Sequence, residues 1–323
     1  MATADYAARF PKHAANGFFR RAEEFTMSSL GLGTYLGGMD EAADGNYVDA
    51  ISAAMAGGIN FIDTSLNYRH QRSERNIGTA LSGFAREEFV ICTKAGYLVP
   101  GAVPVGDLET VRNQHSMAPP FLKDQLARSL ENLRVDAVDI FYLHNPETQL
   151  DALAEDEFYN RVARAFAQCE EMAEAGQLRY YGAATWSGFR QKTGGLSLEK
   201  MLDAARRVGG ERHRFRFVQL PLNLGMCEAL TNGIVFDAAR LGVHVVASAS
   251  LMQARLASNL PEEIGRRLPG PETDAERAIQ FARSAPGVVV ALAGMGRREH
   301  VEANLAVANY PPAPRAQFDS IFE

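Results

Sequence analysis

In Phe89-Val-Ile-Cys-Thr-Lys94 a short apolar run ends on a charged side chain. Ile59-Asn-Phe-Ile-Asp63 and Ile140-Phe-Tyr-Leu-His144 repeat this pattern. Apolar runs of this length are typical of buried parallel strands. An α/β barrel has its chemistry at the C-terminal ends of such strands. The three stretches therefore predict parallel strands that deliver titratable groups to one face.

The same kind of apolar run recurs along the whole chain, and segments with helical spacing lie between the runs. Predicted strands cover residues 29–33, 59–63, 89–93, 137–143, 178–183, 215–220, 243–248 and 288–293. Predicted helices cover residues 46–57, 73–83, 120–133, 157–176, 196–208, 228–241, 272–284 and 297–308. This alternation predicts a (β/α)₈ TIM barrel, formed as a single domain by residues 1–323.

A doubly wound open sheet is the alternative, but no strand is followed by the G-x-G-x-x-G spacing of a dinucleotide-binding turn. The nearest match, Gly31-Leu-Gly-Thr-Tyr-Leu-Gly-Gly38, has the wrong spacing and is interpreted as a tight turn. Two segments add to the barrel. Residues 1–27 form an N-terminal extension that could cover the bottom of the barrel. Residues 95–120 form a long loop after the third strand, which we expect to share in substrate binding.

The composition excludes several classes of function. The chain has 323 residues, 46% of them hydrophobic, and a net charge of −6 without a basic cluster, so no nucleic-acid partner is expected. Three scattered cysteines give neither a metal-binding spacing nor a disulfide framework. There is no long apolar run that would span a membrane. We expect a cytoplasmic protein without a metal.

Several motifs together resemble the signature of the aldo-keto reductase family. They are Asp63-Thr-Ser-Leu-Asn-Tyr68, Arg72-Ser-Glu74, Thr93-Lys94, Leu143-His-Asn-Pro146 and Gly294-Met-Gly-Arg297 with Asn304. The resemblance covers about residues 28 to 310, with the motifs in the family's order. It implies a barrel that binds a nicotinamide dinucleotide, NADP(H), in an extended form without a Rossmann motif.

The resemblance implies a proton relay of four residues. Tyr68 would protonate the carbonyl oxygen as hydride reaches the carbon. The ammonium of Lys94 is expected to lower the pKa of that phenol. Asp63 would hold Lys94 in its charged form, and His144 would donate a second hydrogen bond to the carbonyl oxygen.

The resemblance also implies a set of cofactor-binding residues. Thr185 and Gln219 would hold the carboxamide, and Ser248, Leu251 and Gln253 would line the pyrophosphate. The chain departs from the family pattern by having Ala184-Thr185 in place of a Ser-Asn pair, and Met252 and Ala254 in place of two glycines.

The start of the last helix is expected to bind the adenosine end. A helix N-terminus and its backbone N–H groups favour phosphate, and two arginines there would favour NADPH over NADH. The predicted contacts are Gly294, Gly296, Arg297, Arg298, His300 and Asn304.

The predicted function is transfer of hydride between the nicotinamide and an aldehyde, ketone or alcohol substrate, with Tyr68 as general acid or base. The substrate is expected to contact Tyr97, His115, Met117 and Trp186. Two alternatives stay open: a barrel lyase that uses Lys94 as a Schiff-base amine, and a nicotinamide-binding regulatory subunit with vestigial activity.

Overall fold

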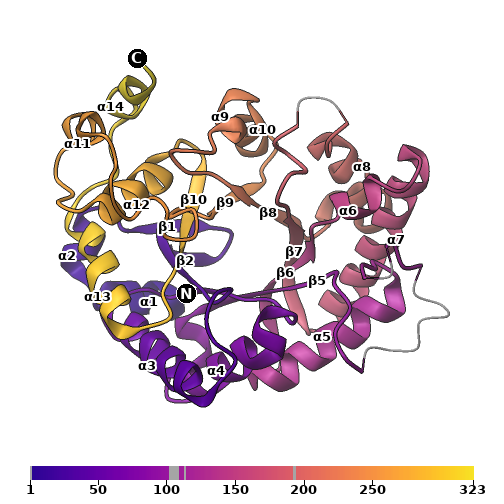
Figure 1. The fold of residues 1–323 in the computed structure, drawn as a ribbon. Helices are drawn as coiled ribbons and strands as arrows, with labels where there is room; N and C mark the ends of the chain where they lie inside the picture. Colours follow the sequence, from indigo (N-terminus) through magenta and orange to yellow (C-terminus); the bar gives the residue numbers. More distant parts are fainter. Residues whose placement is uncertain (1, 102–108, 113, 192–193) are drawn as a thin grey trace.

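A computed structural model describes residues 2–101, 109–112, 114–191 and 194–323 of the chain. Eight parallel strands close into a barrel in the order β10-β3-β4-β5-β6-β7-β8-β9 (Figure 1). The barrel strands are β3 (Leu30–Gly33), β4 (Phe61–Asp63), β5 (Val90–Ala95), β6 (Val138–His144), β7 (Leu178–Ala184), β8 (Phe215–Pro221), β9 (His244–Ser248) and β10 (Val288–Gly294). The predicted (β/α)₈ barrel is confirmed, and each strand overlaps its predicted range.

Helices surround the barrel and cover its strands on the outside (Figure 1). The larger ones are α3 (Glu41–Gly57), α4 (Arg72–Leu81), α5 (Pro119–Leu133), α7 (Glu155–Glu174), α8 (Leu198–Gly209), α12 (Asp274–Ser284) and α13 (Arg298–Leu305). Shorter helices are α6 (Glu147–Leu150), α9 (Glu228–Thr231), α10 (Ile234–Arg240), α11 (Glu262–Arg267) and α14 (Arg315–Asp319).

Local signals explain where α3 begins and ends. The Asp40 side chain accepts a hydrogen bond from the backbone N–H of Ala43, which caps the helix. At the other end Gly58 is left-handed, with φ of 103°. The helix therefore begins five residues before the predicted 46–57.

The predicted helix over residues 228–241 is wrong in one respect, because the structure has two short helices there, α9 and α10. Gly233 lies between them with φ of 84°, a conformation outside the helical region. The apolar spacing continues across this break, which is why the pattern predicted one helix.

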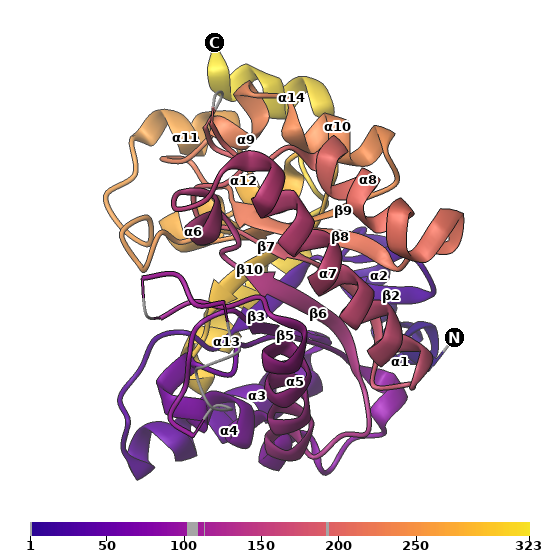
Figure 2. The ribbon, with the colours of Figure 1, turned by 90° about the vertical axis from the view of Figure 1, so that its right-hand side faces the viewer.

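The N-terminal residues form α1 (Ala2–Ala8), α2 (Pro11–Ala15) and a hairpin of β1 (Phe19–Ala22) and β2 (Phe25–Ser28). Ala22, Phe25 and Met27 are buried against side chains from inside the barrel. Figure 2 shows α1, α2 and β2 on one side of the barrel and α6, which follows β6, on the other. The hairpin thus packs on the end of the barrel opposite to the C-terminal strand ends.

The core has two layers, one inside the barrel and one between the strands and the helices. Phe61, Val90, Ile140 and Phe217 belong to the inner layer. Close strand packing requires a glycine at position 182, because an added Cβ atom would lie 1.9 Å from the carbonyl oxygen of Phe217. None of the helices within the described residues is both long enough and apolar enough to span a bilayer.

Candidate active site

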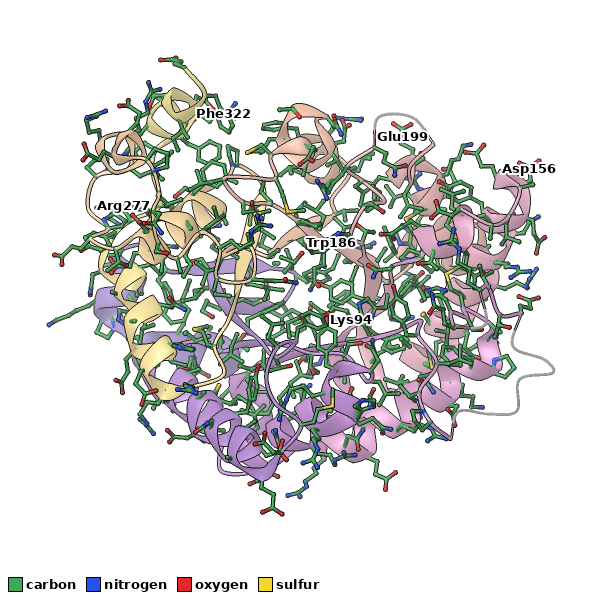
Figure 3. All side chains as sticks on the ribbon, in the orientation of Figure 1. Lys94, Asp156, Trp186, Glu199, Arg277 and Phe322 are labelled. Atoms are coloured by element: carbon green, nitrogen blue, oxygen red, sulfur yellow. The ribbon has the colours of Figure 1, made fainter. Side chains whose placement is uncertain are left out.

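Three adjacent strands deliver charged or polar side chains to one end of the barrel. Asp63 ends β4, Lys94 lies near the end of β5, and His144 ends β6. Tyr68 follows β4 at the start of a 3₁₀ turn, η1 (Tyr68–Gln71). In Figure 3 Lys94 lies over the centre of the barrel. Hydrogen bonds from Lys94 to Asp63 and Tyr68, and a ring contact between Tyr68 and His144, join the four side chains predicted from the sequence.

Lys94 is at the centre of this cluster. Its side chain is 1% exposed, and Nζ donates to Asp63 Oδ2 at 2.7 Å, to the Thr64 carbonyl oxygen at 2.7 Å and to the Tyr68 hydroxyl at 3.4 Å. Burial alone lowers the pKa of an ammonium, but Asp63 and Tyr68 outweigh it, so the pKa of Lys94 is raised. Lys94 is therefore held in its charged form.

Asp63 also accepts a hydrogen bond from the next layer of the site. Gln219 Nε2, on β8, donates to Asp63 Oδ1 at 2.7 Å. Both carboxylate oxygens thus have a partner, one an ammonium and one an amide. The hydrogen bond recorded for the Gln219 side chain within the described part of the chain is this one, through Nε2.

The phenol of Tyr68 has neighbours on three sides. Lys94 Nζ lies 4.8 Å from the centroid of its ring, and the ring centroids of Tyr35 and His144 lie 5.0 and 5.8 Å from it, with interplanar angles of 62° and 76°. Burial raises the pKa of Tyr68, and the charge of Lys94 opposes that rise without overcoming it. The expectation of a lowered pKa at Tyr68 is wrong for this structure, because desolvation is the larger effect.

His144 is held from both its ring and its backbone. Its Nδ1 lies 3.1 Å from Ser65 Oγ, and its carbonyl oxygen lies 2.7 Å from His115 Nε2. Burial, together with the charges of Lys94 and His115, holds the pKa of His144 well below its usual value. His144 is therefore a neutral imidazole near neutral pH.

The predicted substrate residues do not share one environment. His115 and Met117 are buried, with 0% and 2% of their surfaces exposed, whereas Trp186 is 48% exposed. Tyr97 is half-buried, its ring meets that of His144 at 5.1 Å, and its hydroxyl accepts from Asn145 Nδ2 at 3.0 Å. Residues 102–108 and 113 of the long loop lie outside the described residues.

His115 is buried and contacts the His144 carbonyl oxygen, so it supports the backbone of His144. Burial lowers the pKa of His115 to about 4. Backbone pairing of Tyr97 with His115 brings the two ends of the long loop together. Met117 belongs to the hydrophobic core. Among the four predicted substrate residues, Trp186 is the most exposed, and Figure 3 labels it on the same view as Lys94.

The loop after β3 adds exposed apolar side chains that the sequence analysis interpreted only as a turn. Tyr35, Leu36 and Met39 are 56%, 49% and 56% exposed, although the loop is anchored. The Tyr47 hydroxyl donates to the Leu36 carbonyl oxygen, and Arg69 Nε donates to that of Gly38 at 2.8 Å. An aromatic side chain directly after a barrel strand was the signal available in the sequence.

Glu147 is a second residue that the sequence analysis missed. Its Oε1 accepts from the backbone N–H groups of Trp186, Ser187 and Gly188 at 2.7, 2.9 and 3.3 Å. The carboxylate thus fixes the loop after β7 to the segment after His144. Burial raises the pKa of Glu147, and these N–H groups oppose the rise.

A sequence model described as "Aldo/keto reductase family" matches residues 29–260, more than half of the chain. This chain belongs to the aldo/keto reductase family. The match begins at the strand before the Tyr35 loop and includes Asp63, Tyr68, Lys94 and His144.

Curated relatives of this family member have different activities. The NADH-specific methylglyoxal reductase of Escherichia coli (strain K12) is 31% identical over 170 residues, which are 50% of this chain and 49% of that protein. A D-threo-aldose 1-dehydrogenase from a Pseudomonas species is 31% identical over 144 residues, 41% of each chain. The chain thus spans about half the length of these relatives, or less.

Solved structures share the fold over almost the whole chain. An aldo-keto reductase from Bacillus halodurans in its holo form has a TM-score of 0.70 and 20% identity, over 94% of this chain and 95% of that one. An aldo/keto reductase from Klebsiella pneumoniae, in complex with NADP and acetate, has a TM-score of 0.69 and 21% identity, over 93% of each chain. At such identities the likeness concerns the fold alone.

In this member of the family, two polar atoms near the ends of β7 and β8 fit an amide ligand. Thr185 is 5% exposed, and its hydroxyl is buried without a hydrogen-bond partner in the described chain. The second atom is Oε1 of Gln219, whose Nε2 donates to Asp63. A nicotinamide carboxamide needs one acceptor and one donor, so Thr185 and Gln219 could hold it together.

The loop after β9 has an unusual backbone. Met252, Gln253 and Ala254 have φ of 47°, 55° and 67°, so the chain keeps a left-handed loop without the family's glycines. Ser248 and Leu251 are half-buried and Gln253 is exposed. Ser250 is fully buried, with a hydroxyl that no described group satisfies.

The adenosine-side residues lie at the end of β10 and on α13. Gly294 is exposed, and an added Cβ atom there would meet nothing within 4 Å. Gly296 packs beside Tyr47. His300 is exposed, and Asn304 lies one helical turn further on, with 5% of its surface exposed.

The two arginines at the start of α13 differ from each other. Arg298 pairs with Asp49 of α3, with Nε 2.8 Å from Oδ2. Arg297 is exposed and makes no ion pair within the described part of the chain. Only Arg297 is therefore available to a new anion without breaking an existing pair. No group of His, Cys, Asp and Glu within the described residues could hold a metal ion.

Proposed function

We propose that this protein is an NADP(H)-dependent carbonyl reductase in which Tyr68 is the general acid. The observation that carries the proposal is the 3.4 Å contact from the buried, charged Lys94 to the Tyr68 hydroxyl. The ammonium donates to the phenolic oxygen, so the phenolic proton points away from Lys94 and can be donated to another acceptor. Membership of the aldo/keto reductase family supports the same reaction.

Each of these side chains has a separate role at the substrate's carbonyl group. The dinucleotide, when bound, supplies the hydride that reaches the carbonyl carbon. Tyr68 gives its proton to the carbonyl oxygen, and Lys94 stabilises the phenolate left behind. Asp63 keeps Lys94 charged and in position, and His144 offers a neutral N–H to the same oxygen. Tyr35, whose ring centroid lies 5.0 Å from that of Tyr68, would cover one side of the reacting group.

Thr185 and Gln219 would hold the carboxamide, and Arg297 would bind a 2′-phosphate. The neighbour from Klebsiella pneumoniae in complex with NADP supports NADP(H). The Escherichia coli relative is described as NADH-specific, so the two dinucleotides must be compared directly.

The Schiff-base alternative has less support in the geometry. A lysine must lose its proton before it attacks a carbonyl carbon. Lys94 has a raised pKa and gives hydrogen bonds to three oxygens of Asp63, Thr64 and Tyr68. Borohydride should therefore trap no substrate on Lys94.

Turnover of purified protein tests the proposal. Oxidation of NADPH and of NADH is followed optically with a panel of aldehydes and ketones, including methylglyoxal. Trp186 is the chain's only tryptophan, so its fluorescence reports dinucleotide binding separately. We expect binding by wild type and Tyr68→Phe alike, and turnover by wild type only. Binding without turnover by wild type would contradict the reductase and favour a regulatory subunit.

A further inference from the structure

Ser65 is a buried serine between the backbone of Lys94 and the ring of His144. It follows β4, with 1% of its surface exposed. Its Oγ lies 2.7 Å from Asn67 Oδ1, 3.1 Å from the Lys94 carbonyl oxygen and 3.1 Å from His144 Nδ1. A hydroxyl has one proton to donate, so these three neighbours compete for it.

The outcome of this competition decides what His144 can do. A neutral imidazole carries one N–H, on Nδ1 or on Nε2. If the Ser65 hydroxyl donates to Asn67, the hydrogen bond between Ser65 and His144 needs a proton on Nδ1 of His144. Nε2 of His144 then has no proton and can only accept. If Ser65 gives its proton to Nδ1, the ring proton is on Nε2. Only the second arrangement leaves His144 a donor for a carbonyl oxygen.

The two other neighbours of Ser65 allow the donor arrangement. The Lys94 carbonyl oxygen also accepts from the Leu66 backbone N–H at 3.4 Å. Asn67 is half-buried, and no other described group bonds its side-chain amide. The amide can therefore turn and present Nδ2 to Ser65. Asn67 then donates to Ser65, and Ser65 donates to His144.

We propose that Ser65 and Asn67 are positioning residues that hold His144 as its Nε2–H tautomer and so make it a donor toward the carbonyl oxygen. The inference rests on the proposed reductase for its catalytic consequence, but not for the tautomer itself. Both side chains act through the ring of His144 in this arrangement. His115 holds the His144 backbone by a separate contact, so the ring's tautomer depends on Ser65 within the described residues.

The matched variants are Ser65→Ala, Ser65→Thr and Asn67→Asp. Ser65→Ala removes the donor, while Ser65→Thr keeps a hydroxyl. Asn67→Asp presents only acceptor oxygens, so it draws the Ser65 proton away and should leave the ring proton on Nδ1. Ser28→Ala is the control, because Ser28 is also fully buried but donates to the Leu30 carbonyl oxygen at the other end of the barrel.

The tautomer is read by two-bond ¹H–¹⁵N NMR of histidine-labelled protein without dinucleotide. His144→Gln identifies the signals of His144 among the seven histidines. We expect Nε2–H in wild type, Ser65→Thr and Ser28→Ala, a mixture in Ser65→Ala, and Nδ1–H in Asn67→Asp. Nδ1–H in wild type, or an unchanged tautomer in Asn67→Asp, overturns the proposal.

Kinetics supply the second readout. Loss of one donor to a developing oxyanion lowers kcat about 10²- to 10³-fold, and a mixed tautomer should lower it less. Ser65→Ala and Asn67→Asp should thus reduce kcat while Trp186 fluorescence shows unchanged dinucleotide affinity. An unchanged kcat in a protein with the altered tautomer would refute the catalytic consequence. Absence of carbonyl turnover in wild type would refute the reductase and leave the NMR result standing.

Discussion

Tyr68 and His144 differ in the direction in which the protein moves their pKa values. Burial raises the pKa of Tyr68 against the opposing charge of Lys94, and it lowers that of His144. A general acid acts only while protonated, so reduction should be lost as pH rises through the Tyr68 pKa. His144 stays neutral until the pH falls well below the usual value of about 6.5.

These directions predict a broad plateau in the pH profile of kcat/KM, which reports the free enzyme. Reduction should stay level through the range in which an ordinary histidine titrates and fall only in alkaline solution. Steady-state rates at saturating dinucleotide measure the profile. A decline centred near neutral pH would contradict the assigned protonation states.

Lys94 and Asp63 form a pair that is almost completely removed from solvent. Lys94→Met should abolish turnover, and it should also destabilise the fold, because it leaves the Asp63 carboxylate buried without its cation. Breaking a buried pair from one side costs about 3–5 kcal/mol. Urea unfolding measures the loss, and the double variant Asp63→Asn/Lys94→Met should recover much of it. Equal stabilities of Lys94→Met and the double variant would show that the unpaired Asp63 carboxylate is not the cause of the loss in Lys94→Met.

At the scale of elements, the two arginines at the start of α13 differ in their binding partners. A charge-assisted hydrogen bond to a phosphate contributes about 1.5–3 kcal/mol. Arg297→Ala should therefore lower the affinity for NADPH by about ten- to a hundredfold and barely change the affinity for NADH. Arg298→Ala should have the smaller effect, because Arg298 is paired with Asp49.

Trp186 fluorescence titration with both dinucleotides measures these affinities. Asp49→Ala provides the complementary change, since it frees Arg298 and should strengthen NADPH relative to NADH. Equal weakening of both dinucleotides by Arg297→Ala would make that arginine structural instead.

The loop after β9 holds alanine and methionine where the backbone is left-handed. Ala254 has φ of 67° and is exposed, so Ala254→Gly loses little packing. Relief of about 1–2 kcal/mol of left-handed strain should exceed the loss of about 0.4–1 kcal/mol from a more flexible unfolded chain. Urea denaturation should show a small gain in stability.

The matched control for this change is Ala316→Gly, at an exposed position of α14. It should destabilise slightly, because glycine lowers helix stability. Destabilisation by both substitutions would show that the loop conformation costs this chain little.

Elements also differ in how far the sequence could predict them. The barrel strands were predictable, because strands buried on both faces are continuously apolar. The β1–β2 hairpin was not, since its strands carry Arg20, Arg21 and Thr26 among apolar residues. Its two-residue turn has Glu23 at φ of 52° instead of the Asn or Gly that marks such a turn.

The active site likewise contains residues that could be predicted from the sequence and residues that could not. Asp63, Tyr68, Lys94 and His144 occur in recognisable motifs at strand ends, so their meeting could be predicted. The contacts of Ser65 with His144 and of Glu147 with the loop after β7 join segments 79 and 39 to 41 residues apart. Such pairs follow from barrel closure and side-chain direction, and no short motif encodes them.

At the scale of the whole molecule, the two ends of the barrel have different tasks. The relay lies at the C-terminal ends of the strands, and the β1–β2 hairpin packs at the opposite end. Phe25 is 3% exposed, and its ring packs against that of Tyr180 with the centroids 5.9 Å apart and the planes at 83°. It belongs to the apolar layer inside the barrel, so it should contribute to stability without touching the chemistry.

Phe25→Ala should therefore lower the free energy of unfolding by about 3–5 kcal/mol, the usual loss when a buried phenylalanine is truncated. The folded fraction should keep the wild-type kcat and dinucleotide affinity, because the relay lies at the opposite end of the barrel from the cavity. Chemical denaturation and initial rates on the same preparation measure both quantities. Phe322→Ala makes the same substitution where the ring is 51% exposed, and it should cost far less stability. A reduced kcat in fully folded Phe25→Ala protein would show that the hairpin is coupled to the active site through the barrel interior.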